Sequence, residues 1–331
     1  MQPRISIIMP VHNGGTYLAE AVASILGQSH ASLELLLVDD HSDDGAVAGL
    51  RQEDGRLRLL QNPGRGVAQA FNHGLHQAKG EFVARMDADD IAMPDRIKVQ
   101  LGFLDEHPAV DICGGCVEIF SSRALAGGNL RYQQWLNACR SPQEIHQQLF
   151  IESPIPNPTV VFRRQAIDQL GGYHDPQWPE DYDLFLRADG LGMRMGKPAE
   201  IVLRWREHEQ RLTRTDARYD IARFQAAKAH YLVEDRLDGR AVVIWGAGPS
   251  GRLMYDLLQA EGARIDGFLD VHPRRIGGRK RGLPVWPIEH AIQLQDEMVL
   301  VAVGAAGARK KIHHWMNEHA KEQGRDYLFV A

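Results

Sequence analysis

The first 90 residues alternate short apolar runs with segments whose apolar residues recur at helical spacing. The runs of strand length are residues 4–11, 33–38, 57–60 and 82–86. Between them, residues 17–26 and 67–75 carry apolar side chains at intervals that place them on one face of a helix. This alternation predicts an α/β fold built on a doubly wound, parallel sheet.

The pattern weakens after residue 120 and returns in a smaller form near the C-terminus. Residues 121–140 lack clear periodicity, so we expect a loop-rich insert there. Further strands are expected at 159–162 and 201–205, and helices at 142–150, 163–170 and 216–235. A second strand–turn–helix pattern begins at residue 241, and the chain is long enough for two domains. We therefore expect domains at 1–215 and 239–331, joined by a helical linker at 216–238.

Carboxylates follow two of the predicted buried strands. Asp39 and Asp40 end the second run, and Asp87-Ala88-Asp89-Asp90 ends the fourth. Ligands bind beyond the carboxyl ends of strands in open α/β sheets, so both sets are expected to line one crevice. Because Mg²⁺ commonly bridges carboxylates to phosphates, the pattern favours a nucleotide-diphosphate site with a divalent cation.

These acidic motifs also have structural interpretations. Asp90 or Asp95 could cap the helix expected after Pro94. Glu180 and Asp181 fall in the first turn of another expected helix, where acids suit the helix dipole. The functional alternative is that one of these two acids is a general base at a cleft.

Composition narrows the class of protein. Hydrophobic residues make up 44% of the chain and charged residues 24%, as in ordinary globular proteins. The net charge of −5 argues against nucleic acid as a partner. Three cysteines, no signal-peptide pattern and no apolar run of about 20 residues predict a cytoplasmic protein without a membrane span. Peripheral contact with the inner face of the membrane and a homo-oligomer both stay open. Cys113-Gly-Gly-Cys116 is expected to be strand packing, with a zinc or redox site as the alternative.

Several stretches, taken in order, resemble the family 2 glycosyltransferases with their GT-A fold, over about residues 3–215. They are residues 6–13 (SIIMPVHN), 37–42 (LVDDHS), 72–74 with 79–81, 87–90 with 94–96, 171–173 (GGY) and 180–184 (EDYDL). The resemblance implies a mixed, doubly wound sheet and transfer of a sugar from a nucleotide-diphosphate donor, typically a UDP-sugar. It also implies inversion at the anomeric carbon and an acceptor hydroxyl on a glycan or lipid-linked glycan.

The resemblance assigns roles to individual residues. Asp181, beside Glu180, would be the catalytic base. Asp89 would hold Mn²⁺ or Mg²⁺ next to the diphosphate, and Asp87 would lie near the ribose or the metal. His208 would reach the metal or the phosphates, with an ordinary surface histidine as the alternative. Asp39 would hydrogen-bond the nucleotide base. The donor-binding set would be Pro10, Val11, His12, Asn13, Asp39, Arg65, Asn72, Asp87 and Ala88.

Three positions depart from the family pattern. His12 stands where relatives commonly carry tyrosine, and His41 stands where they carry glycine. Phe71 replaces an arginine that contacts phosphate in many relatives, and Arg65 is the expected substitute. The catalytic set is complete, whereas the donor contacts are expected to differ in detail.

The C-terminal segment carries a separate glycine motif. Gly246, Gly248 and Gly251 follow an apolar run and precede a helical pattern, with Asp270 at the end of the next run. This arrangement is typical of a Rossmann-like module and indicates a second nucleotide site. The alternative is that the glycines serve only close packing, since about 93 residues from Gly239 onward are too few for a full dinucleotide domain.

Three other functions fit the sequence less well than glycosyl transfer. A nucleotidylyltransferase shares the sheet type, but it should carry a glycine-rich loop with a basic residue straight after the first strand, and residues 12–15 (HNGG) have no such residue. An NAD(P)-dependent oxidoreductase acting through residues 246–251 would need a Tyr-x-x-x-Lys set or a His/Asp pair near that motif, and the sequence has neither. A non-catalytic sugar-nucleotide-binding protein would have lost the base or the metal ligand, yet Asp181 and Asp89 are both present. We therefore expect a metal-dependent glycosyltransferase that does not use NAD.

Overall fold

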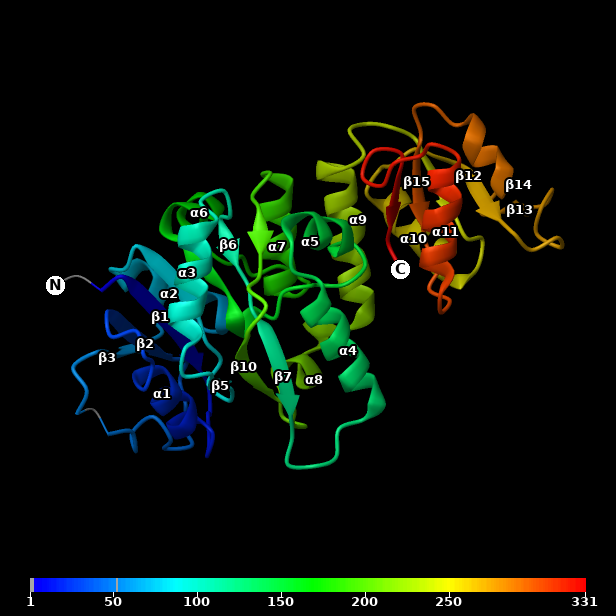
Figure 1. Ribbon diagram of the computed structural model, residues 1–331. Helices are drawn as coiled ribbons and strands as arrows, with labels where there is room; N and C mark the ends of the chain where they lie inside the picture. The colour runs from blue at the N-terminus through cyan, green and yellow to red at the C-terminus, as the bar shows by residue number, and fades with distance from the viewer. Residues whose placement is uncertain (1–2, 52) are drawn as a thin grey trace. The chain divides into compact units, whose positions relative to one another are not determined.

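The computed structural model describes residues 3–51 and 53–331, and its chain forms two compact units (Figure 1). The first unit comprises Met1–His146 and Pro154–Arg218, and the second comprises Gln147–Ser153 and Tyr219–Ala331. Helix α9 (Ile221–Asp235), which the sequence analysis treats as a linker, groups with the second unit. The short segment Gln147–Ser153 also groups with it, although it lies far from the rest of that unit in the sequence.

A mixed seven-stranded sheet is the centre of the first unit. Its order is β3 (Leu57–Gln61), β2 (Leu33–Asp39), β1 (Ile5–Val11), β4 (Phe82–Arg85), β8 (Val161–Arg163), β6 (Ile112–Cys113) and β9 (Met195–Gly196). The first four strands are parallel, and β8 is antiparallel to both β4 and β6. The expected mixed, doubly wound α/β fold is confirmed.

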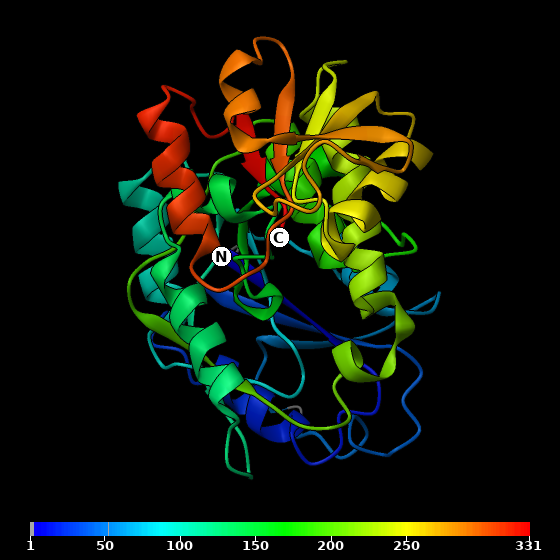
Figure 2. The same cartoon turned by 90° about the vertical axis from the view of Figure 1, so that its right-hand side faces the viewer.

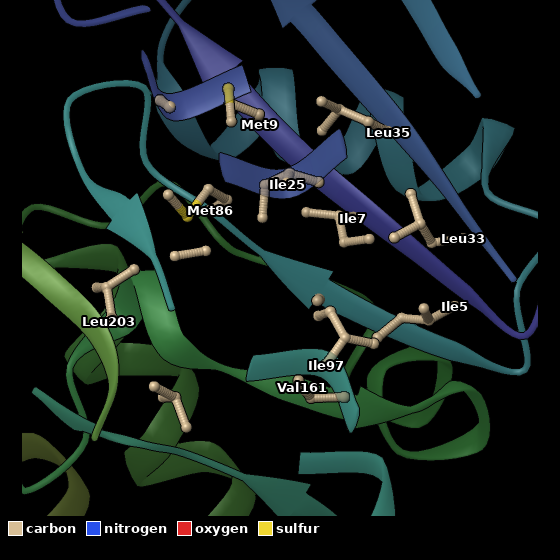
Figure 3. Close-up of a cluster of buried hydrophobic side chains, with 14 of the residues drawn as sticks. Ile5, Ile7, Met9, Ile25, Leu33, Leu35, Met86, Ile97, Val161 and Leu203 are labelled. Carbon is tan, nitrogen blue, oxygen red and sulfur yellow. The ribbon is translucent and has the colours of Figure 1, made fainter. Parts of the chain in front are cut away.

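Helices cover this sheet because their apolar faces meet those of the strands. They include α1 (Leu18–Leu26), α2 (Val67–Gln77), α3 (Arg96–Glu106), α6 (Arg164–Leu170) and α7 (Glu180–Gly190). Figure 3 shows Ile5, Ile7 and Met9 of β1 packed with Ile25 of α1 and Leu35 of β2. These strands are buried on both faces, which is why they are mainly apolar. Their buried polar residues pair with each other, because Ser6 Oγ donates to Glu34 Oε1 at 2.6 Å.

A second, three-stranded sheet contains β5 (Ile91–Ala92), β10 (Ile201–Arg206) and β7 (Cys116–Phe120). Helix α4 (Gly127–Ala138) lies against β7, so the prediction of a loop-rich insert at 121–140 is wrong. Two polar side chains hold this helix on the strand. Asn137 Oδ1 accepts a hydrogen bond from the Val117 N–H at 2.9 Å, and Gln133 Oε1 accepts one from the Ile119 N–H at 2.6 Å. The pattern of apolar residues could not predict this helix, because side-chain amides hold it on the strand.

The three cysteines are buried thiols. Cys113 ends β6, and Cys116 opens β7 after a two-glycine turn. Burial raises the pKa of the Cys113 thiol to about 12, so it stays protonated and unreactive at neutral pH. The place of Cys113 and Cys116 inside strands agrees with the packing interpretation of this motif.

The second unit is a small Rossmann-like domain. Its sheet has the order β13 (Arg279–Lys280), β14 (Leu283–Pro287), β12 (Ile265–Asp270), β11 (Val242–Trp245), β15 (Met298–Val301) and β16 (Tyr327–Phe329). Helix α10 (Pro249–Ala260) follows β11, and helix α11 (Ala308–Glu318) follows β15 (Figure 2). Buried Lys228 of α9 donates through Nζ to the carbonyl oxygen of Ile151 at 2.7 Å, which ties the segment Gln147–Ser153 to this unit. Helix α5 (Pro142–Gln148) leads into that segment.

None of the helices in the described ranges 3–51 and 53–331 has both the length and the apolar character that crossing a membrane requires.

Candidate active site

The end of β4 brings three carboxylates together. One oxygen each of Asp87, Asp89 and Asp90 lies within 4.8 Å of the other two. Asp90 is 1% exposed, and its Oδ1 accepts a hydrogen bond from the Arg206 N–H at 2.8 Å. Asp95 occupies the N-cap position of helix α3 but makes no capping hydrogen bond through its side chain, and Asp90 binds Arg206 instead. The expectation that the side chain of Asp90 or Asp95 caps this helix is therefore wrong.

Residues at the end of β10 hold the middle acid of this cluster. His208 Nε2 lies 2.8 Å from Asp89 Oδ2. Arg206 donates from Nε to the Asp89 carbonyl oxygen at 2.7 Å, and its guanidinium stacks 4.3 Å from the ring centroid of Tyr17. The sequence prediction that His208 belongs with Asp89 is thus matched by their positions, and Arg206 joins them.

A buried arginine supports the cluster from beneath. Arg96 is fully buried and donates from Nη2 to the carbonyl oxygen of Arg85 at 2.7 Å. Its Nε donates to Gln100, which in turn donates to the carbonyl oxygens of Gly114 and Thr159. Burial lowers the pKa of Arg96 to about 10, so the side chain remains charged at neutral pH. Its cation lies below the acids and offsets part of their repulsion.

Asp181 lies near this cluster although it is almost 100 residues away in sequence. It sits in the first turn of α7, and its Oδ1 accepts a hydrogen bond from the Tyr182 N–H at 2.7 Å. Its side chain is half-buried, but the surrounding protein and the charge of Glu180 raise the pKa of Asp181 to about 7. Arg85 and Asp87 are close enough to act on the same pKa.

Arg85 interacts with both acidic groups. It is 4% exposed, and its Nε donates to Asp87 Oδ1 at 3.1 Å. Its guanidinium lies 5.3 Å from the ring centroid of Tyr173. The positive charge lowers the pKa of Asp181, against the larger effects of burial and Glu180. Arg85 therefore links the carboxylates after β4 with the acid on α7.

The loop before α7 is fixed by Asn72. Its Nδ2 donates to the Tyr173 carbonyl oxygen at 2.7 Å, and its Oδ1 accepts from the Tyr173 N–H at 2.9 Å. Arg187 of α7 donates to the carbonyl oxygens of Leu170 and Gly172 in the same loop. The side-chain amide of Asn72 thus holds the backbone of this loop in place. That Asn72 also contacts the nucleotide-sugar donor stays a prediction.

We predict that Gly172→Ala destabilises the first unit more than Gly171→Ala. Both glycines have positive φ, +77° and +70° respectively. A Cβ at 172 would lie 2.3 Å from Asn72 Oδ1, whereas a Cβ at 171 meets nothing within 4 Å. The left-handed backbone costs alanine about 1–2 kcal/mol at either position, and displacing Asn72 adds about 1–3 kcal/mol at 172. Urea unfolding of the intact protein measures both, and equal losses would contradict the clash.

The loops after β1, β2 and β3 bind one another at the carboxyl edge of the sheet. Asp40 accepts hydrogen bonds from Asn62 Nδ2 at 2.7 Å and from the Gly66 N–H at 2.8 Å. His12 Nδ1 lies 2.7 Å from the Asp40 carbonyl oxygen. Asp39 accepts from the Ser42 N–H at 3.0 Å and is half-buried. Pro10, Val11, Asn13, Asp39 and Arg65 all lie on these loops or the strand ends before them.

His41 shows why relatives favour glycine at this position. Its φ is +60°, a left-handed conformation that glycine adopts most readily. Its Nε2 lies 2.8 Å from the Gly64 carbonyl oxygen, which anchors the loop that carries Arg65. Histidine at position 41 is therefore less favourable than glycine for the backbone conformation, but its side chain adds a contact with the neighbouring loop.

The carboxylate oxygens of the three acids after β4 are suitable ligands for a divalent cation. Asp90 Oδ2 is buried and has no hydrogen-bond partner among residues 3–51 and 53–331. Burial and the charges of Asp89 and Asp87 raise the pKa of Asp90 well above its ordinary value. A hard cation with oxygen ligands would pair this oxygen and relieve the repulsion among the three carboxylates.

The glycine motif of the second unit has a packing explanation. A Cβ at Gly251 would lie 1.7 Å from the Gly246 carbonyl oxygen, and Gly246 has a φ of +116°. Asp270 accepts hydrogen bonds from the N–H groups of Ala247 and His272 and from Arg275. Close packing accounts for two of the glycines, and the second nucleotide site, including Gly248, stays a prediction.

Three arginines were missed by sequence reasoning: Arg85, Arg96 and Arg206. A functional role for Arg85 could have been predicted, because it is a charged residue inside an apolar run directly before the acids. Arg206 also lay two positions from His208. Arg96 looked like an ordinary residue in the first turn of a helix, and only its burial shows its contact with β4.

The mixed α/β sheet, with acids after β4 and two further acids in the first turn of α7, agrees with the GT-A fold of glycosyltransferases. Residues 6–171, half of the chain, match glycosyl transferase family 2, and the chain belongs to this family. Residues 241–316 match the PglD N-terminal domain.

Two named relatives support this membership. Putative glycosyltransferase EpsE of Bacillus subtilis is 30% identical over 66% of this chain and 78% of its own length. The amylovoran biosynthesis glycosyltransferase AmsE of Erwinia amylovora is 31% identical over 43% of this chain and 50% of its own length.

Solved structures share the fold. A fragment of S. aureus TarS, in complex with UDP-GlcNAc, has a TM-score of 0.58 at 19% identity and covers 79% of this chain and 71% of that chain. The mannosyltransferase PcManGT of Pyrobaculum calidifontis, in complex with GDP-Man and Mn²⁺, has a TM-score of 0.50 at 22% identity, with 71% and 63% covered.

Proposed function

We propose that the protein is an inverting glycosyltransferase that moves a sugar from a nucleotide-diphosphate donor, a UDP-sugar, to a hydroxyl of a glycan or lipid-linked glycan. One observation carries the proposal. A metal-type cluster of acids lies near a separate acid, Asp181, whose pKa is raised to about 7. A metal-assisted transfer needs ionised carboxylates that hold the cation and a separate carboxylate that accepts a proton as the general base. The UDP-GlcNAc bound by TarS supports the choice of donor.

In this mechanism Asp181 accepts the proton of the acceptor hydroxyl as its oxygen bonds to the anomeric carbon. The bond from that carbon to the diphosphate breaks on the opposite side, which inverts the configuration. A divalent cation held by Asp87, Asp89 and Asp90 supplies, when bound, charge neutralisation for the leaving diphosphate. Arg85 keeps Asp87 on the donor side, and Asn72 fixes the loop that leads to Asp181.

The raised pKa of Asp181 predicts the acid limb of the pH profile. Burial and Glu180 move this pKa from 3.8 to about 7, and only the ionised form accepts a proton. We therefore expect kcat/KM to fall about tenfold per pH unit below pH 7 and to level off above it. Steady-state rates between pH 5 and 9 measure this. A flat profile down to pH 5 would contradict the assignment.

The proposal is tested by thermal unfolding of the intact protein with UDP, GDP, dTDP or NAD, each with and without Mn²⁺. A ligand at 100 times its Kd adds about 2.7 kcal/mol, a readily measured shift. We expect Mn²⁺-dependent stabilisation by UDP above the other nucleotides. Stabilisation by NAD alone, independent of Mn²⁺, would move the chemistry to the second unit and overturn the proposal.

The setting of the reaction is proposed by analogy. AmsE is named for amylovoran biosynthesis, which supports a role in building a polysaccharide. We propose that the protein acts in the cytoplasm, where it extends an acceptor at the inner face of the membrane.

A further inference from the structure

The carboxyl edge of the second unit's sheet is rich in positive charge. Strands β11, β12, β14 and β15 are parallel, so the segments after them meet at this edge. The first turns or loops there carry six cations: Arg252, Arg274, Arg275, Arg309, Lys310 and Lys311. Glu289, in the helical turn after β14, is the acid in these segments beyond Asp270. The edge is thus strongly basic in a chain whose net charge is −5.

Most of this charge is not used inside the protein. Arg275 pairs with Asp270 at 2.9 Å, and Arg252 donates to the Ala247 carbonyl oxygen. Within the described ranges, no salt bridge engages the other four cations. Three of them, residues 309–311, are consecutive and exposed at the start of α11. They are therefore free to meet an external anion.

Apolar side chains are exposed at the same edge. Val271, directly after β12, is 69% exposed, and Ile292, in the turn after β14, is 45% exposed. A large apolar side chain beside lysine and arginine is the combination that favours the boundary between lipid headgroups and acyl chains. Binding of an anion by charge alone, by contrast, would not require exposed apolar side chains.

The end of β12, at this edge, already holds an anion of the protein. Asp270 Oδ2 accepts from the Ala247 N–H at 3.0 Å and from Arg275 at 2.9 Å. Asp270 is 5% exposed, and its bonds with these groups lower its pKa. The four cations without a salt bridge lie on two separate segments, the turn after β12 and the first turn of α11, so they suit an extended anionic surface better than one phosphate.

We infer that this edge, with Val271, Ile292, Arg274 and residues 309–311, docks the protein onto an anionic lipid surface. The inference concerns the second unit and stands independently of the proposed transferase reaction. The occupant is a bilayer whose headgroups carry negative charge.

The test is sedimentation of the intact protein with vesicles of phosphatidylcholine, with or without phosphatidylglycerol. We expect binding only with phosphatidylglycerol and weaker binding as salt rises. The triple variant Arg309→Gln, Lys310→Gln, Lys311→Gln should reduce partitioning roughly 100-fold, since each cation near an anionic surface contributes roughly a factor of five. Val271→Ser should also weaken binding, and it leaves the charge unchanged.

The matched control is the triple variant Arg279→Gln, Lys280→Gln, Arg281→Gln. It removes the same charge from β13 and the turn after it, where Arg281 pairs with Asp256 at 2.5 Å. We expect this variant to bind vesicles almost as the wild type does. Equal loss in both triples, or equal binding to neutral vesicles, would overturn the inference. Circular dichroism checks that each variant is folded. If the residue 309–311 triple proves unfolded, Val271→Ser alone decides, and unchanged binding then overturns the inference.

Discussion

Asp181→Asn is expected to abolish sugar transfer and to leave donor binding nearly intact. The substitution keeps the size of the side chain but removes the group that accepts the proton. A positioned general base contributes about 10²–10⁴-fold, so the turnover number should fall by at least about 100-fold. The acids that would hold the cation, and through it the diphosphate, lie after β4, on a different element, and are unchanged. Transfer rates and UDP binding by calorimetry measure the two effects separately.

Two variants make this experiment specific. Asp168→Asn removes an exposed carboxylate of α6 that pairs with Arg164, and it should leave transfer unchanged. Glu180→Gln removes the neighbouring charge that raises the pKa of Asp181, so it should shift the acid limb of the profile to lower pH. Substantial transfer by Asp181→Asn would exclude it as the base. If Glu180→Gln abolished sugar transfer and Asp181→Asn did not, Glu180 would be the general base.

Asp89→Ala is expected to remove metal-dependent binding of UDP. Asp89 offers one of three carboxylate oxygens that lie within 4.8 Å of one another, and its Oδ2 is 2.8 Å from His208. Even outer partners of a metal site are worth about 10–100-fold in metal affinity, so loss of a ligand should cost at least about 100-fold. Titration with UDP at several Mn²⁺ concentrations measures this.

The control for this variant is Asp95→Ala. Asp95 lies on the same stretch of chain, but it is exposed and accepts a hydrogen bond from Ser29. Its loss should leave metal-dependent binding unchanged. Unchanged UDP affinity in Asp89→Ala, with the same response to Mn²⁺, would remove Asp89 from the metal site.

Strands and acidic motifs could be predicted because their signals are local. β1, β2 and β4 are buried on both faces, so each is a mainly apolar run, and the acids that follow β2 and β4 mark where those strands end. Parallel strands then bring their ends to one edge, which makes the loop after β4 a candidate site from sequence alone. This reasoning reaches Asp87, Asp89 and the neighbourhood of Asp39.

Helix α4 and the segment Gln147–Ser153 could not be predicted in this way. α4 is held on β7 through the amides of Gln133 and Asn137, and such bonds leave no periodic apolar pattern. The segment joins the second unit through a backbone carbonyl bound to Lys228, and any residue could supply that carbonyl.

The amino-acid sequence by itself determined the α/β class, the two-part organisation and the acids that follow β2 and β4. Burial of apolar runs and the chemistry of neighbouring residues are sufficient for these features. Only the tertiary structure decided which distant groups interact. It brought Arg85 and Asp87 into electrostatic range of Asp181, placed Arg206 on Asp89, and turned Asn72 toward the backbone of Tyr173. The pKa of Asp181 depends on the burial and charge that come from this arrangement, because the free energy of ionisation is set by surroundings in space.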